Sequence, residues 1–246
     1  MDHFTIQTGD YNIRPGLVGS HENAWRWLSK PGTWLDGAQR VAVAAEIRQA
    51  HSCKLCAEKK EALSPNVVQG EHDSLGVLNA NQVGVIHQVA TDSGRTSEAW
   101  CRGAIDAGMG EGEFVEISGI VAMVMMMDTF KRGMGLPEDQ LPAAEAGEPS
   151  RYVPPGAKRQ AAWVPITEPE DVSDSDGPMY PSPKAGYIYR ALSSVPDSMR
   201  AYWDLANEHY IPGQFIYDFA TTARSILRPQ IELIAARVAA LHQCAY

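Results

Sequence analysis

The segment from Glu113 to Arg132 constrains the fold of this chain more than any other part of its sequence. Its apolar residues recur every three or four positions, which is the period of one helical face. Its longest apolar run, residues 117–127, is too short to span a bilayer, which needs about 20 such residues. Strand-like alternation is weak throughout the chain, so the sequence predicts an all-α fold. The apolar positions of this helix are Phe114, Ile117, Ile120, Val121, Val124 and Phe130.

Other segments repeat the helical period and carry helix-capping residues. We expect Asp36 to cap the helix that follows it, and Ser52 to cap a helix carrying Cys53 and Cys56, because their oxygens accept hydrogen bonds from the first free backbone N–H groups. Besides residues 113–132, helices are expected over residues 21–29, 37–50, 53–63, 81–90, 96–107, 187–194, 197–210, 217–227 and 229–242.

The character of the sequence changes between Leu136 and Lys184, where ten of the 16 prolines fall. This composition predicts a long connection that lies over the surface of the helical body, with Tyr152 and Trp163 as anchors. The expected organisation has three parts: an N-terminal half with the cysteine pair (residues 1–135), a Pro-rich connecting segment (136–185) and a C-terminal, incomplete half (186–246).

The two halves share a short repeat. Residues 41–53 are VAVAAEIRQAHSC and residues 232–244 are ELIAARVAALHQC, and four of the aligned positions are identical, including the final His-x-Cys. The shared ending at one helical phase predicts two related helical halves joined by the Pro-rich segment. The identical pairs are Ala44/Ala235, Ala45/Ala236, His51/His242 and Cys53/Cys244.

The pair Cys53 and Cys56 is the feature with the clearest chemistry. Cysteines three positions apart share a helical face, so their sulfurs can meet in a disulfide. At a helix N-terminus the first thiol meets free N–H groups and the positive end of the helix dipole, and both favour the thiolate, which is the reactive form. A peroxide or disulfide substrate would be attacked by one thiolate, and the second would resolve the product.

Two other interpretations of the cysteine pair stay open. Both residues can simply pack in a core, because unpaired cysteine behaves as a small hydrophobe. They can also form half of a zinc site, which needs two more ligands. The candidate ligands are His51, Glu71, His72 and Cys244, but no second CxxC or HxxxH is present. The expectation we adopt is a site with no metal and no cofactor.

The formal net charge of −9 makes nucleic acid or an anionic membrane an unfavourable partner. The first residues, MDHFTIQTGDYN, have neither the basic nor the apolar region of a secretory signal. Four cysteines are too few for a disulfide scaffold. We therefore expect a cytoplasmic protein that binds neither nucleic acid nor membrane.

The dithiol and its surroundings resemble the AhpD-like alkylhydroperoxidase and carboxymuconolactone decarboxylase superfamily. The resemblance covers roughly a third of the chain: residues 37–65 and 228–246, which look like the motif region, and EFVEISGIVAMVMMMDTFKRGMGLP, which looks like the helix beside it. Redox members of the family carry Glu-x11-Cys-x2-Cys-x3-His, in which the cysteines cycle through a disulfide while the Glu and His relay a proton. The resemblance implies an AhpD-like helical bundle and thiol peroxidase chemistry.

The first half departs from the family motif around its two cysteines. Val41 stands at the Glu position and Lys60 at the His position. Other acid–base partners can serve a thiol peroxidase, and Glu71 and His72 follow closely enough to fold back onto the dithiol. His87, in the apolar segment VGVIHQVA, is expected to be a buried histidine of the core.

The second half departs in a different way. Glu232 and Cys244 have the family spacing, but the chain ends at Tyr246, one residue before the second cysteine would fall. Neither half carries the whole motif. The expected catalytic residues are therefore Cys53, Cys56, Glu71, His72, Glu232 and Cys244.

The function expected from these features is thiol-dependent reduction of a small peroxide or disulfide, with a reductant protein or thiol as partner and a homo-oligomeric assembly. One alternative is a non-catalytic binding or regulatory protein on the same fold, because the family Glu and His are missing beside the dithiol. A third is a carboxymuconolactone decarboxylase-like reaction, against which the CxxC argues.

Overall fold

The computed structural model describes residues 6–242 and 244, and within these residues it contains helices and no β-strand. The all-α prediction is confirmed. The α-helices are α1 (Pro15–Ser29), α2 (Gly37–Ala50), α3 (Lys54–Glu61), α4 (Ala80–Asp92), α5 (Glu98–Asp106), α6 (Glu111–Gly133), α7 (Tyr187–Arg190), α8 (Pro196–His209) and α9 (Arg228–Leu241). Short 3-10 turns occupy Pro65–Val67, Ser93–Arg95, Pro169–Asp171, Asp174–Asp176 and Gly213–Phe215.

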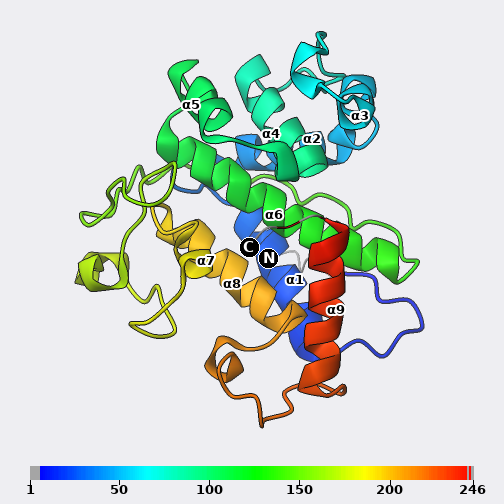
Figure 1. The fold of residues 1–246 in the computed structure, drawn as a ribbon, viewed down its shortest axis with the longest axis vertical. Coiled ribbons are helices and arrows are strands. Elements are labelled where there is room, and N and C mark those ends of the chain that lie inside the picture. Colours follow the sequence, from blue (N-terminus) through cyan, green and yellow to red (C-terminus); the bar gives the residue numbers. More distant parts are fainter. Residues whose placement is uncertain (1–5, 243, 245–246) are drawn as a thin grey trace.

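Helix α6 is the central element of the fold. Figure 1 shows it crossing the middle of the molecule, with α2 to α5 on one side and α7 and α8 on the other. Helices α2 and α4 pack against α6 and against each other, and α8 packs against α6 and α1. Helix α3 packs on α4 at the edge of this arrangement. The functional site described below lies where α2, α3 and α4 meet.

The sequence of α6 explains both its burial and its end. Residues at helical spacing, such as Ile117, Ile120 and Val124, are fully buried, as the apolar period predicts. The helix ends in a Schellman motif, because Gly135 adopts a φ of +66° and the Leu136 N–H donates to the Lys131 carbonyl at 2.9 Å. No helix within residues 6–242 is long and apolar enough to cross a membrane.

The ends of α2 and α3 test the two predicted caps. Asp36 caps α2 as predicted, since its carboxylate accepts from the Gln39 N–H at 2.8 Å. The Ser52 cap is wrong: Cys53 is the N-cap residue of α3 and makes no side-chain capping bond. The cap comes from a distant residue instead, because Asp73 accepts from the Lys54 N–H at 2.8 Å.

The region after α8 does not follow its predicted helix. Residues 217–227 form turns and bends, because the Asp218 carboxylate accepts from the N–H groups of Ala220 and Thr221 and holds a local turn. In the Pro-rich segment the Tyr152 hydroxyl donates to Asp176 at 2.7 Å, which ties the segment to itself and not to the helical body. Trp163 is 40% exposed, so it is not the buried anchor that was expected.

The two helices of the predicted repeat differ in their environment. Helix α2 buries Val43 and Ile47 in the core, whereas α9 leaves Leu233 and Leu241 more than half exposed. Both helices have 14 residues. The relationship between the two halves therefore stays a prediction made from the sequence.

Candidate functional site

Four side chains that can bind a metal or exchange protons converge beside α3. They are Cys53 and Cys56 at its start, His72 in the following loop and His87 in α4, and one ligand atom of each lies within 4.8 Å of all the others. Both cysteines and His87 are buried, whereas His72 is partly exposed. Both cysteines are free thiols.

Each sulfur has an imidazole nitrogen within contact distance. The Cys56 Sγ lies 3.2 Å from Nδ1 of His87 and 3.4 Å from Nδ1 of His72. The Cys53 Sγ lies 3.6 Å from the same His72 nitrogen. Each thiol S–H therefore has an imidazole Nδ1 within reach as an acceptor.

Glu46 of α2 fixes the orientation of His87. Its Oε1 lies 2.9 Å from Nε2 of His87, and neither side chain is exposed beyond 1%. A carboxylate accepts, so Nε2 carries the proton and Nδ1 keeps a lone pair that faces Cys56. The other oxygen of Glu46 accepts from the Leu75 N–H at 3.0 Å, so one carboxylate holds both α4 and the loop.

The loop that carries His72 is held against α2 and α3 on its other side. Asp73 accepts from the first N–H of α3 through its carboxylate, and from the Gln49 amide, at 3.0 Å, through its backbone carbonyl. These bonds flank His72 and keep its ring tilted against that of His87, with ring centroids 4.4 Å apart.

Burial keeps Cys56 and His72 uncharged. The pKa of Cys56 is raised to about 12, first because burial disfavours the thiolate and then because of its hydrogen bond with Cys53. The pKa of His72 is lowered to about 4 by burial, by His87 and by Lys59, in that order. At Cys56 burial therefore outweighs the helix N-terminus, and the thiolate expected at the first thiol, Cys53, stays a prediction.

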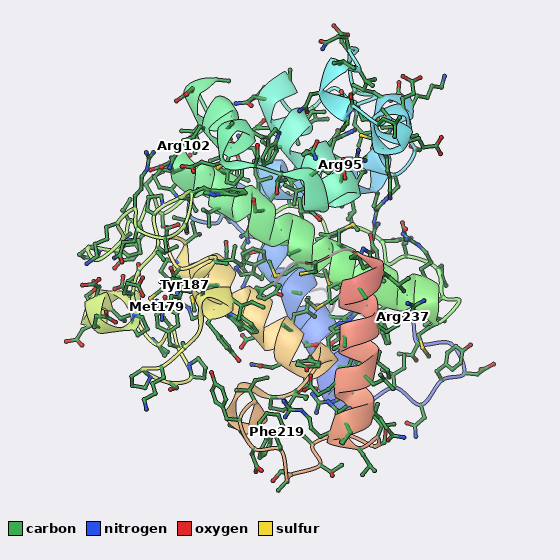
Figure 2. All side chains as sticks on the ribbon, in the orientation of Figure 1. Arg95, Arg102, Met179, Tyr187, Phe219 and Arg237 are labelled. Atoms are coloured by element: carbon green, nitrogen blue, oxygen red, sulfur yellow. The ribbon has the colours of Figure 1, made fainter. Side chains whose placement is uncertain are left out.

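A cavity of about 570 Å³ reaches the site through His72, which is part of its wall. Arg95, labelled in Figure 2, also belongs to this wall and pairs with Asp92 at the end of α4 at 2.8 Å. Its guanidinium donates to the backbone carbonyl of Lys60 at 2.7 Å and so ties the end of α3 to the end of α4. The remaining wall has mixed polarity and includes Lys59, Asn81, Gln88 and Trp100.

The structure brings together three of the six residues expected at the site: Cys53, Cys56 and His72. In the described part of the chain, Glu71 is exposed and contacts neither sulfur. Glu232 accepts from Tyr210 at 2.7 Å and from Arg228 at 2.5 Å, far from the dithiol in sequence, and Cys244 is exposed.

Two members of the site were missed by the sequence analysis. His87 is buried as expected, but it also touches Cys56, and Glu46 was not considered. Glu46 lies three residues after Val43 and four before Ala50, which places a carboxylate on the buried stripe of α2. A glutamate on the buried face of a helix indicates that a buried partner exists. The sequence does not identify the partner, His87, which is 41 residues away.

Neither a known family model, a curated protein nor a solved structure matches this chain. The resemblance to the AhpD-like superfamily therefore stays a prediction made from the sequence.

Proposed function

We propose that this protein is a thiol oxidoreductase that reduces small hydroperoxides by cycling Cys53 and Cys56 through a disulfide. The observation that carries the proposal is the buried series Cys56–His87–Glu46, in which a thiol contacts an imidazole whose other nitrogen is held by a carboxylate. A nucleophile, a base and a group that orients the base are the parts of an activated thiol.

The first step needs His87 as a general base. Its Nδ1 takes the Cys56 proton when the peroxide arrives, and Glu46 stabilises the imidazolium that forms. The thiolate attacks the terminal oxygen of the peroxide, the O–O bond breaks, and the alcohol leaves with the proton. Cys56 is then a sulfenic acid. This transient transfer is consistent with a thiol that is neutral at rest.

Cys53 completes the reaction. Its sulfur attacks the sulfenic sulfur, the S–S bond forms, and the departing hydroxide takes up the Cys53 proton and leaves as water. His72, 3.6 Å from Cys53 Sγ, is positioned to carry that proton. A thiol reductant must then return two electrons to the disulfide. The cavity that ends at His72 offers a route for a small substrate.

The test is disulfide formation in the purified, reduced and chelator-treated protein. After one equivalent of hydrogen peroxide or an organic hydroperoxide, peptide mapping by mass spectrometry should show a Cys53–Cys56 disulfide. Cys56→Ser should abolish peroxide consumption, and Cys53→Ser should leave a trappable sulfenic acid. Cys244→Ser is the matched control, because Cys244 is an exposed thiol outside the site.

The result that contradicts the proposal is equally clear. If peroxide is consumed at the same rate by Cys56→Ser and by the unmodified chain, or if no intramolecular disulfide forms, the dithiol is not a redox site. The AhpD-like bundle, the duplicated halves, a homo-oligomeric assembly and a cytoplasmic location are part of the same proposal, and no step above depends on them.

A further inference from the structure

We propose that Cys53, Cys56, His72 and His87 bind one zinc ion through their Sγ and Nδ1 atoms. The four atoms come from α3, the following loop and α4, and lie within 4.8 Å of one another. Two sulfurs and two imidazole nitrogens form a donor set that zinc prefers, whereas calcium and magnesium prefer oxygen.

Three sulfur–nitrogen distances among the four atoms match a tetrahedral zinc ion. With zinc–sulfur bonds of about 2.3 Å and zinc–nitrogen bonds of about 2.0 Å, tetrahedral geometry separates a sulfur from a nitrogen by about 3.5 Å. The three Sγ–Nδ1 contacts at the site are 3.2, 3.4 and 3.6 Å long. Both sulfurs therefore already lie at such a distance from Nδ1 of His72, and Cys56 also from Nδ1 of His87, while all four atoms lie within 4.8 Å of one another.

Glu46 supplies the support that metal-bound histidines usually have. A ligating imidazole commonly donates its second N–H to a carboxylate, which fixes the tautomer and makes the ligand nitrogen more basic. Glu46 does this for His87 and leaves Nδ1 free to bind. The second oxygen of Glu46 accepts from the Leu75 N–H at 3.0 Å, so the carboxylate that orients the ring is itself held in place.

Charge balance also favours an ion at this depth. Zinc carries two positive charges and replaces the two thiol protons, so the buried cluster of two thiolates, two neutral imidazoles and one ion has no net charge. A lone thiolate in the same place has no such compensation.

Four protein ligands leave no open coordination position, so the zinc would be structural. It would tie the start of α3 and the loop to α4, where α3 has few buried side chains of its own, namely Leu55 and Cys56. The zinc proposal does not rest on the proposed redox function, because metal binding needs only the reduced sulfurs and the two imidazoles.

The experiment is metal titration of the whole reduced protein after removal of metal with a chelator. Zinc, in competition with a chromophoric chelator, should bind at one ion per chain. Cobalt should give visible bands typical of a tetrahedral site with sulfur ligands. His72→Ala should weaken binding by at least tenfold. This variant spares the core, since His72 lies in a partly exposed loop.

The matched control is His51→Ala, which removes an exposed histidine that is near the dithiol in sequence. Its Nε2 contacts Sδ of Met125 and lies outside the four-residue cluster. It should leave zinc binding unchanged. The inference is overturned if the protein does not bind one zinc per chain. It is also overturned if His72→Ala and His51→Ala lose zinc affinity equally. Because the peroxide experiment uses metal-free protein, either proposal can fail without affecting the result of the other.

Discussion

Nε2 of His87 donates a hydrogen bond to Oε1 of Glu46 across 2.9 Å, and both side chains are buried. This pair joins two helices that are far apart in sequence and aims the free nitrogen of the imidazole at Cys56. The same orientation suits a base that accepts the thiol proton and a ligand that binds zinc. Both proposed properties of the site therefore depend on one carboxylate.

Replacing Glu46 by Gln tests that dependence. The amide keeps the size of the side chain but loses the charge that orients His87 and stabilises its imidazolium, so zinc affinity should fall by about 10- to 100-fold. Disulfide formation by peroxide in metal-free protein should slow by at least about tenfold. Zinc competition and stopped-flow thiol assays measure the two effects.

Glu71→Gln is the control for this change, because Glu71 is exposed and adjacent to His72 in sequence. It should alter neither quantity. A larger effect from Glu71→Gln than from Glu46→Gln would show that the exposed carboxylate, which sequence spacing favoured, is the functional one.

Hydroperoxide should release zinc from the loaded protein, since the same two sulfurs cannot hold the ion and form a disulfide. The two zinc-bound thiolates give two electrons to the O–O bond, the S–S bond forms, and two protons from solvent complete the alcohol and water. One zinc should appear per disulfide, measured with a chromophoric chelator. A disulfide that forms while zinc stays bound would contradict a shared site.

Glu116→Gln should destabilise the fold away from the site. Glu116 and Arg40 are fully buried and lie 3.4 Å apart, and burial raises the pKa of Glu116 and lowers that of Arg40 to about 10. Loss of one charge leaves the other uncompensated, so the free energy of unfolding should drop by about 3–5 kcal/mol. Urea denaturation measures this loss.

The double variant with Arg40→Met provides the control for the ion pair. It removes the unpaired buried cation as well. Its free energy of unfolding should therefore fall by clearly less than the sum of the losses in the two single variants. Additive losses would mean that the two charges do not stabilise each other.

Stability should decline in acid because of His21 and His209, whose Nε2 atoms lie 2.8 Å apart. Burial is the main reason that the pKa of His21 falls to about 3 and that of His209 to about 4. The unfolded chain binds these protons near pH 6.5, so stability is lost as pH falls from there towards 4. His209 alone contributes up to about 3 kcal/mol.

His209→Gln should reduce the loss of stability between pH 6.5 and 4. At pH 7.5 its free energy of unfolding should differ less from that of the parent chain than it does at pH 4.5. Urea midpoints between pH 7.5 and 4.5 measure the slope. An unchanged slope would contradict the assignment to this pair.

Local sequence patterns predicted most of the helices. They gave a wrong prediction where a side chain accepts hydrogen bonds from the backbone next to it. The apolar period of α6 and the Asp36 cap were sufficient for α6 and α2, because neighbours in sequence determine both. The 217–227 helix was wrong because Asp218 holds a turn that apolar spacing does not reveal.

The site was predictable only as far as its members are close in sequence. Cys53 and Cys56 form a local motif, and His72 follows within the next loop. Glu46 and His87 meet only when α2 and α4 pack together, which no spacing rule encodes. The pKa of Cys56 likewise depends on packing, since the burial that raises it comes from the helices around the thiol.

The spacing of the four ligands along the chain has a consequence for how the two states resist unfolding. A disulfide between Cys53 and Cys56 closes a very short loop and restricts the unfolded chain by only about 2 kcal/mol, whereas loops near 15 residues, like those between Cys56, His72 and His87, correspond to about 3 kcal/mol each. Oxidation would replace a zinc crosslink that spans residues 53–87 by a disulfide that spans residues 53–56. The oxidised chain would then be the more easily cleaved by proteases between residues 57 and 86, opposite to proteins that are stapled by their disulfides.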